Sequence, residues 1–365
     1  MILMNDFSKD SVQLKSKIVE AITEVIDSGW YVLGKNVQSF EREFAKTLGI
    51  EYSVGVGNGM DAIEIILRSR GIGAGDEVIT SAMTAFPSVL AIIRAGAVPV
   101  LADIEPGTGI MSINSVKNCV TSKTKAVLLV HLYGQIRQMQ SWKQLAKDCD
   151  IDLIEDCAQC HLASSEGESA GSFGVAGAYS FYPTKNLGAY GDAGAIATNS
   201  QEIKESARIL RDYGQKSKYD HTEIGLNSRL DEVQAAILIK RLEILKVQTT
   251  RRQDIAKLYF ENVNASSIRL LEKPLASENH VFHLFVVLSD RRDHFKDHLL
   301  QNGIQSNIHY PIPMHQQKAL VEFNLGGNDL SFSEQHASEC ISIPCHPNMT
   351  DVEVFKVIEA INTFR

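Results

Sequence analysis

The chain has 365 residues, of which 44% are hydrophobic and 22% are charged, and this length indicates about two domains. The composition excludes a disordered chain, a collagen and a small protein that depends on disulfides. The formal net charge of −8 argues against general nucleic-acid binding, because contacts to phosphate dominate that affinity.

In the first two thirds of the chain, apolar β-branched segments alternate with longer helical segments. Such alternation indicates βαβ units and a mostly parallel sheet with helices on both faces. The expected strands are Ser53–Val56, Glu77–Ser81, Val98–Ala102, Ala126–His131, Asp152–Glu155, Ala178–Phe181 and Gly194–Thr198, and the expected helices are Asp61–Arg70, Pro87–Ala95, Gln140–Cys149 and Glu202–Tyr213.

A long periodic segment from Arg229 to about Val263 predicts one helix that leaves the sheet. The pattern then changes to short strands and helices. We therefore predict an α/β fold with a large domain at residues 1–244 and a smaller α+β domain at residues 245–365. In the second domain we expect a strand at His280–Leu288, a helix at Arg292–Gln301, a strand at Ile304–Tyr310 and a helix from Thr350 to the end.

A glycine cluster follows the first strand and opens the next helix. Gly57, Gly59 and Ala62 fit G-x-G-x-x-A, in which a helix N-terminus offers free backbone N–H groups to a phosphate. The alternative is a tight turn capped by Asn58. A nicotinamide-dependent reductase is a further possibility, because Glu77 stands about twenty residues past Gly57.

Asp156 stands at the carboxyl end of an apolar strand, which is where ligands bind in open α/β sheets. It either caps the next helix or meets a ligand. Cys157, Cys160 and His161 match the C-x-x-C-H haem pattern, but covalent haem attachment needs export. We read these cysteines as small apolar fillers and expect no metal.

Lys185 follows another strand and enters a loop that contains Gly188, Gly191 and Gly194. Lysines are usually on solvated surfaces, and a desolvated lysine has a lowered pKa that suits a Schiff-base nucleophile. The alternative is a solvated surface lysine. Lys185 lies 185 − 156 = 29 residues after Asp156. A lysine, a carboxylate and a phosphate-binding turn are the parts of a pyridoxal phosphate site.

At these residues the sequence resembles the DegT/DnrJ/EryC1/StrS group of nucleotide-sugar aminotransferases. The resemblance covers nearly the whole chain and implies the aspartate aminotransferase fold, which is fold type I of the pyridoxal phosphate enzymes. Its segments are Ser28–Gly34, Gly73–Ile79, Val130–Gln135, Ile154–Gln159, Ser180–Gly188, Asn227–Glu232, His309–Pro313 and Ile343–Pro347.

The resemblance implies a role for each matching residue. It assigns Lys185 to the covalent link with the cofactor and to catalysis, Asp156 to the pyridine nitrogen and Gln159 to the 3-hydroxyl. The remaining matches concern the phosphate. Ser180 would contact it through its hydroxyl, Gly59 and Met60 through their backbone N–H groups, and Asn227 from the neighbouring subunit of a homodimer with shared sites.

Two positions depart from the family pattern. Many members have Thr or Ser in place of Met60, so a hydroxyl contact to the phosphate is missing. Many members also have an aromatic residue directly after the threonine that matches Thr84. Here Ala85 follows, so either Phe86 covers the cofactor ring or the stacking contact is lost.

The implied activity is transfer of an amino group, with glutamate as donor, to a keto group of a nucleotide-linked sugar. The segment Gly29–Gly34 with Asn58–Ala62 is most similar to members that aminate C-3 of dTDP-3-keto-6-deoxyhexoses. Members that aminate C-4 of dTDP- or UDP-linked 4-keto sugars share the same cofactor residues and stay an alternative. The group implies deoxyamino sugar biosynthesis for a lipopolysaccharide or O-antigen.

The candidate sugar contacts are Tyr31, Tyr182, His309 and Tyr310, while His283 and His315 either line the same site or pack elsewhere. A dehydratase of the same group would carry His in place of Lys185. A non-catalytic regulatory protein with this fold is a third alternative, which the pairing of Lys185 with Asp156 disfavours.

The start of the chain, MILMNDFSKD, lacks the features of a signal peptide, and no apolar run is long enough to span a membrane. Together with six cysteines that we expect to be reduced, this predicts a cytoplasmic protein. The expected partners are the nucleotide sugar, glutamate and a second copy of the chain, with no nucleic acid and no membrane.

Overall fold

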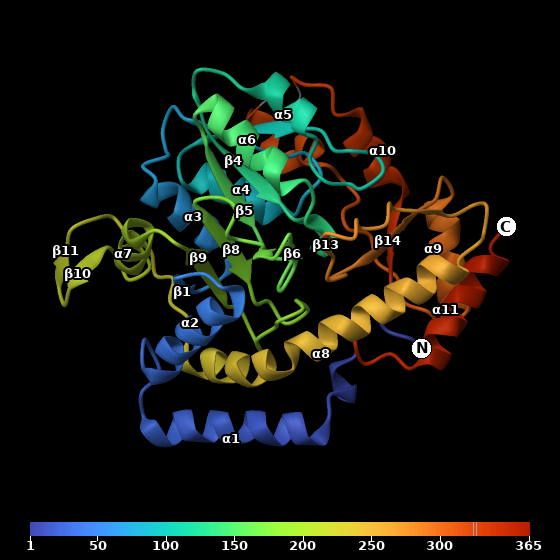
Figure 1. Ribbon diagram of the computed structural model, residues 1–365, viewed down its shortest axis with the longest axis horizontal. Coiled ribbons are helices and arrows are strands. Elements are labelled where there is room, and N and C mark those ends of the chain that lie inside the picture. The colour runs from blue at the N-terminus through green and yellow to red at the C-terminus, as the bar shows by residue number, and fades with distance from the viewer. Residues whose placement is uncertain (324, 326) are drawn as a thin grey trace.

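A seven-stranded sheet, in the order β1-β9-β8-β5-β4-β2-β3, forms the centre of the computed structural model, which describes residues 1–323, 325 and 327–365 (Figure 1). β3, β2, β4, β5 and β8 run parallel, whereas β9 runs antiparallel to β8 and to β1. The strands are β1 (Tyr52–Val56), β2 (Glu77–Ser81), β3 (Val98–Ala102), β4 (Thr124–Val130), β5 (Asp152–Asp156), β8 (Ala176–Ser180) and β9 (Gly194–Thr198).

Helices cover both faces of this sheet because successive side chains of each strand point to opposite faces. In β4, Ala126 and Leu128 pack on one face, and Val127 and Leu129 pack on the other. The first face is covered by α3 (Gly59–Ser69), α4 (Phe86–Arg94) and α7 (Gln201–Leu210), and the second by α2 (Lys35–Leu48), α5 (Ile113–Cys119) and α6 (Met139–Cys149).

These elements confirm the predicted α/β class and the seven predicted strands, with small differences at their ends. The four predicted helices are also confirmed, although α7 ends at Leu210 and not at Tyr213. Helix ends are the least certain part of any reading from sequence, because fraying and side-chain caps decide them.

The long helix α8 (Glu232–Asn262) links the central sheet to a second hydrophobic cluster (Figure 1). Leu238 packs with the sheet, and Tyr259 packs with the second cluster. That cluster also contains Ile2, from the start of the chain. The predicted boundary between the two domains, after residue 244, stays a prediction. The second cluster lies among β12 (Arg269–Leu270), β14 (Phe285–Leu288), β15 (Cys340–Ile343), α9 (Arg292–Gln301) and α11 (Asp351–Thr363).

Three segments near the second cluster differ from the prediction. The strand expected at His280–Leu288 is confirmed only at Phe285–Leu288, because the N–H of Val281 bonds instead to Gly134 of a tight turn. The strand expected at Ile304–Tyr310 was wrong, since this segment makes only isolated bridges. The carbonyl of His309 accepts the Tyr133 hydroxyl at 2.6 Å. The third difference is β15, which was not predicted and which pairs with β14 on the side opposite β12.

The remaining elements lie around the central sheet, α8 and the second hydrophobic cluster. α1 (Val12–Ser28) packs on α8 through Leu14 and Ile18 against Ile237, and the hairpin of β10 and β11 projects beyond α7 (Figure 1). Among the residues described, no helix combines the length and the hydrophobicity that crossing a membrane requires. The smaller elements are β6 (Ser164–Ser165), β7 (Glu168–Ser169), β10 (Gln215–Ser217), β11 (Asp220–His221), β13 (Glu278–Asn279) and α10 (Ser331–Glu339).

A buried glutamate joins the starts of two helices. Glu232, in the first turn of α8, is 1% exposed, and its carboxylate accepts the backbone N–H groups of Gly34 and Val37 at 2.8 and 2.9 Å. It also accepts the backbone and side-chain N–H groups of Asn36, both at 2.9 Å. One side chain therefore satisfies donors at the N-terminus of α2, where no intrahelical acceptors exist.

We expect Glu232→Ala to lower the free energy of unfolding by about 3 kcal/mol, because four donors at the start of α2 lose their acceptor and one of them, the N–H of Val37, is buried. Chemical denaturation followed by circular dichroism measures this loss. Glu243→Ala on the same helix is the control, since Glu243 forms an exposed ion pair with Lys17 and should cost less than about 1 kcal/mol. Equal losses in the two variants would contradict the anchoring role of Glu232.

Candidate active site

The residues expected to hold a cofactor come together at the carboxyl ends of β5 and β8. Asp156 ends β5, and it lies opposite Ala178 of the parallel strand β8. The chain continues from β8 through Ser180 to Lys185. Neighbouring parallel strands therefore deliver the carboxylate and the amine to the same edge of the sheet.

The Asp156 carboxylate is buried and held by two donors. The residue is 6% exposed, Oδ2 accepts the Ser88 hydroxyl at 2.8 Å, and Oδ1 accepts the backbone N–H of Ala158 at 3.1 Å. Ser88 lies in the first turn of α4, and its own hydroxyl is 3.0 Å from that of Thr84. Asp156 therefore caps the turn after β5 and also contacts a helix far away in the sequence.

Lys185 is half-buried, and this burial lowers its pKa from the ordinary value of 10.5 to about 8. Burial disfavours the charged ammonium, whereas Asp156 nearby acts in the opposite direction. The unprotonated share of this amine near neutral pH is thus larger than for an exposed lysine. An amine of this kind can attack an aldehyde, so the interpretation of Lys185 as a solvated surface residue does not fit.

The glycine turn at the start of α3 packs tightly against the end of β8. A Cβ atom on Gly59 would lie 2.7 Å from Cβ of Ser180, so only glycine fits there. Asn58 caps the helix by accepting the N–H of Asp61 at 2.9 Å, and Ser228 accepts the N–H of Gly57 at 3.0 Å. Gly59 and half-buried Met60 are the first residues of α3, where backbone N–H groups lack intrahelical acceptors. This cradle fits a phosphate.

Gln159 lies on the other side of Asp156 with its amide oriented by two partners. Its Oε1 accepts the backbone N–H of Tyr133 at 2.7 Å, and its Nε2 donates to the Tyr310 hydroxyl at 3.2 Å. Burial raises the pKa of Tyr310 to about 12, so this hydroxyl stays protonated.

Uncharged imidazoles lie around Lys185. Burial, together with the charge of Lys185, lowers the pKa of His161 to about 3 and that of His309 to about 4. The pKa of His283 is also lowered, and this ring contacts Asn186, the residue after Lys185, at 3.2 Å. His315 instead contacts Glu334 at 2.8 Å, away from these groups.

The other candidate residues lie at the margins. Phe86 is the first residue of α4 and packs against a cluster that contains Val89 and Met314, so its contact with a cofactor ring stays a prediction. Tyr31 and Tyr182 are exposed. Asn227 is exposed and is not a helix cap, because Asp231 occupies the N-cap position of α8.

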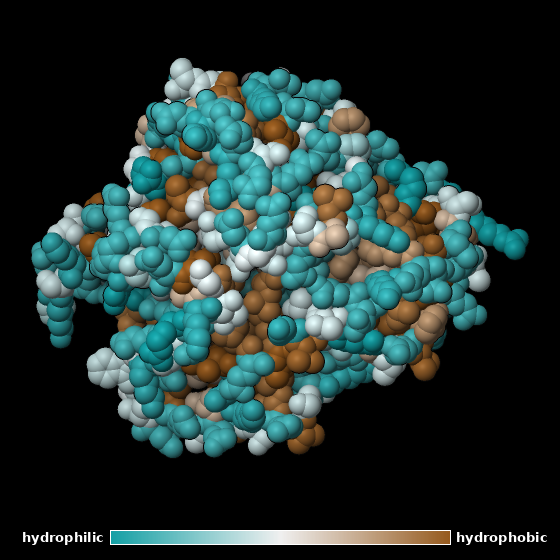
Figure 2. Space-filling view, in the orientation of Figure 1, coloured by the Kyte–Doolittle hydropathy of each residue, from teal (hydrophilic) through white to brown (hydrophobic). Residues whose placement is uncertain are grey.

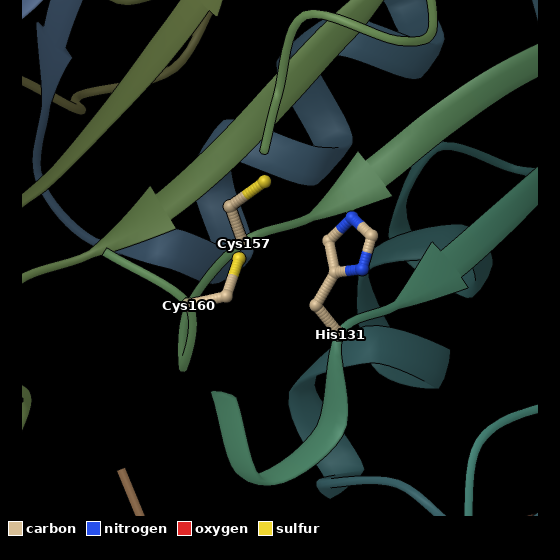
Figure 3. A group of neighbouring side chains, drawn as sticks. All are labelled: His131, Cys157 and Cys160. Carbon is tan, nitrogen blue, oxygen red and sulfur yellow. The ribbon is translucent and has the colours of Figure 1, made fainter. Parts of the chain in front are cut away.

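A buried group directly after β4 and β5 consists of His131, Cys157 and Cys160, whose nitrogen and sulfur atoms lie within 4.8 Å of one another (Figure 3). Burial raises the pKa of both thiols, and His131 contacts the Glu155 carboxylate at 2.9 Å. Protonated thiols are poor metal ligands, because the thiolate is the form that binds. Both cysteines are fully buried, and their interpretation as apolar fillers stays a prediction.

Two residues of this site carried no signal that a single sequence could reveal. Ser88 follows Thr84 by four residues, which is ordinary helix spacing, and nothing local relates it to Asp156. Tyr133 adopts a positive φ of 65°, and it reaches Gln159 through its backbone and His309 through its hydroxyl. Both contacts depend on how the chain folds.

The chain is similar to known proteins along nearly its whole length. The DegT/DnrJ/EryC1/StrS aminotransferase family matches residues 12–362. The dTDP-3-amino-3,6-dideoxy-alpha-D-galactopyranose transaminase of Aneurinibacillus thermoaerophilus is 44% identical over 368 residues, which cover 100% of this chain and 99% of that protein. A pleiotropic regulatory protein of Geobacillus stearothermophilus is 39% identical, over 99% of this chain and 98% of that protein.

Among solved structures, DesV of S. venezuelae in complex with a ketimine intermediate superposes with a TM-score of 0.95 at 37% identity. The match covers 99% of this chain and 97% of that chain. The large sheet, the long helix and the second cluster are thus a known arrangement.

We expect Gly59→Ala to weaken the binding of pyridoxal phosphate about tenfold or more, because the new methyl group must displace Ser180 or the start of α3. Fluorescence titration of the cofactor-free protein measures this affinity. Gly73→Ala is the control, because a Cβ atom there approaches only Ala95 O, at 3.4 Å. A Gly59→Ala protein with unchanged affinity would show that the phosphate does not bind at this turn.

Proposed function

This chain belongs to the DegT/DnrJ/EryC1/StrS family of pyridoxal phosphate-dependent aminotransferases, and we propose that it converts the keto group of a dTDP-3-keto-6-deoxyhexose to an amine, with glutamate as the donor. One observation carries this proposal. Lys185, whose pKa is about 8, lies near enough to the buried carboxylate of Asp156 for that charge to influence it. An amine and a carboxylate in this arrangement suit an enzyme that moves protons at a carbon atom.

Each residue has a defined task in this proposal. When bound, pyridoxal phosphate supplies an electron-withdrawing ring. Asp156 balances the charge of the ring nitrogen, and Gln159 donates to the 3-hydroxyl. Lys185 would hold the aldehyde covalently, and its amine, once displaced by the amine of the substrate, would carry a proton between the substrate carbon and the cofactor. Gly59, Met60 and Ser180 bind the phosphate through backbone and hydroxyl groups, as the cradle at the start of α3 supports.

Amination at C-3 is supported by the relative that is 44% identical along the whole chain and is named for a dTDP-3-amino sugar. Tyr31, Tyr182, His309 and Tyr310 are the proposed sugar contacts. His309 and Tyr310 are supported by their closeness to Gln159 and Lys185. Amination of a 4-keto sugar is the alternative, because the cofactor residues do not depend on which carbon reacts.

A regulatory role is the second candidate, since one relative is named a pleiotropic regulatory protein. The chemistry of Lys185 argues for catalysis, because a protein that only senses a ligand has no need of an amine with a lowered pKa near a carboxylate. Turnover of a nucleotide sugar separates these two candidates.

The substrate proposal is tested with a set of purified keto-sugar nucleotides. The protein is first converted with glutamate to its amino form, which should bleach the visible absorbance of the cofactor. We expect the dTDP-3-keto-6-deoxyhexose to restore the absorbance at least about tenfold faster than a dTDP- or UDP-linked 4-keto sugar. Lys185→Ala should show neither step. Faster recovery with a 4-keto sugar would reject the C-3 assignment, and no recovery with any keto sugar would reject the function.

The proposed assembly is a homodimer in which Asn227 reaches the cofactor phosphate of the second copy. Trp30, Tyr31 and Tyr190 are exposed although they are large and aromatic. They border the start of α8, since Tyr31 O accepts the N–H of Glu232 at 3.1 Å and the N–H of Tyr190 donates to Gln234 at 2.9 Å. Figure 2 shows hydrophobic side chains at the surface between α8 and the sheet. A second copy would bury them.

We expect Asn227→Ala to weaken cofactor binding about tenfold, and removal of the cofactor from the wild type to loosen the dimer, because a ligand shared by two copies favours their association. Sedimentation of the cofactor-free and loaded forms at low micromolar concentration tests this. Asn264→Ala is the control, because Asn264 lies at the far end of α8. An active, loaded monomer would refute the shared site.

We also propose a cytoplasmic location and a place in deoxyamino sugar biosynthesis for a lipopolysaccharide or O-antigen. The location is supported by six free cysteines, which include the neighbouring pair Cys157 and Cys160. The pathway rests on the family alone.

A further inference from the structure

We propose that Ser88 is a positioning residue for the reaction: Thr84 donates a hydrogen bond to Ser88, and Ser88 donates to Asp156, so that two buried hydroxyls hold the carboxylate that serves the cofactor nitrogen. This inference rests on the proposed cofactor role of Asp156. It adds Thr84 of the β2–α4 connection and Ser88 of α4 to a site that is otherwise built on β5, β8 and α3.

The direction of the two hydrogen bonds follows from counting protons. An ionised carboxylate only accepts, so the single hydroxyl proton of Ser88 must point to Oδ2 of Asp156, 2.8 Å away. The Ser88 oxygen can then only accept from Thr84, which lies at 3.0 Å. The two hydroxyls therefore form one chain that ends on the carboxylate. Each bond polarises the next and strengthens it.

The surroundings make this chain rigid. Thr84 is 1% exposed and Ser88 is 2% exposed, so water cannot replace either hydroxyl without a rearrangement. The second carboxylate oxygen accepts the N–H of Ala158 at 3.1 Å. With one donor on each oxygen the carboxylate cannot rotate freely, and lone pairs remain on both oxygens for a further donor.

Ser88 has no other evident structural task in α4. A serine in the first turn of a helix usually caps it or bonds to a nearby carbonyl. Here the N-cap position belongs to Ala85, and the Ser88 hydroxyl bonds to a residue 68 positions away in the sequence. Its hydroxyl therefore serves Asp156 and not the helix.

The test uses the pH dependence of the visible absorbance of the cofactor-loaded protein and the dissociation constant of pyridoxal phosphate. Positive charge on the ring nitrogen repels the proton on the link between Lys185 and the cofactor. If Asp156 holds this charge less firmly, the link keeps its proton to higher pH. We expect Ser88→Ala to move the midpoint of the absorbance titration to higher pH and to weaken the binding of pyridoxal phosphate about tenfold. Ser88→Thr should stay close to the wild type in both measurements.

Ser81→Ala is the matched control. Ser81 is also 2% exposed, but its hydroxyl bonds locally to the carbonyl of Met83 at 3.0 Å. It should lose similar stability and keep both the midpoint and the dissociation constant. Thr84→Val, which removes only the outer donor, should shift the midpoint in the same direction by less, and it serves as the test if Ser88→Ala does not fold.

The outcomes separate this inference from the proposed function. A midpoint and a dissociation constant in Ser88→Ala equal to those of the wild type would overturn the role of Ser88, and so would an equal shift in Ser81→Ala. If Asp156→Asn moves the midpoint while Ser88→Ala and Thr84→Val do not, the cofactor role of Asp156 stands and only the positioning role fails. A wild type without any cofactor absorbance would instead reject the proposed function.

Discussion

The arrangement of the site depends on keeping the Lys185 amine out of water beside the Asp156 carboxylate. Removing an ammonium from water is costly unless it is paired or loses its proton. Here burial lowers the pKa of Lys185 to about 8, while Asp156 partly opposes the shift. The amine is therefore a usable nucleophile close to neutral pH. The pKa of Lys185 keeps this value only if the Asp156 carboxylate stays in place.

The fold keeps the Asp156 carboxylate in position by bringing separate segments of the chain to one edge of the central sheet. Adjacent parallel strands carry Asp156 and the approach to Lys185, and the start of α3 packs on Ser180 so closely that a side chain at Gly59 is excluded. Helix α4 adds Ser88 from another direction. Farther away, Glu232 ties α8 to α2, which fixes the segment that carries Tyr31. Rigid elements thus position the groups that a cofactor would contact.

The central sheet and its helices could be predicted because each strand and helix has its own local signal. Alternation of apolar residues and the glycine turn after the first strand predict the seven strands of the central sheet and α3 without reference to other parts of the chain. The same holds for Asp156 and Lys185, each at a strand end. The segments at residues 280–284 and 304–310 could not be predicted as they are, because their backbone groups bond to distant parts of the chain. The first bonds to the turn at Tyr133 and Gly134, and the second bonds to Ile2, to Ser342 and to the Tyr133 hydroxyl.

Within the site as well, residues with a local sequence signal could be predicted, whereas residues that act through distant contacts could not. Glycines and a strand-end lysine are unusual locally, so they are noticed. Ser88 and Tyr133 are ordinary residues whose importance comes from contacts with residues distant in sequence, 68 positions away for Ser88 and 26 for Tyr133. The likeness to a known family supplied Gln159 and Asn227, which no spacing rule singles out. Only the folded chain shows that Gln159 is oriented by Tyr133 and Tyr310.

The most direct test of the claim that Lys185 is the covalent partner of the cofactor is to reduce the loaded protein with borohydride and to locate the attached group by peptide mass spectrometry. We expect one pyridoxyl group per chain, on the peptide that contains Lys185, and no labelling of Lys185→Ala. A pyridoxyl group on a different lysine, or an equal yield from Lys185→Ala, would contradict the site described for this chain.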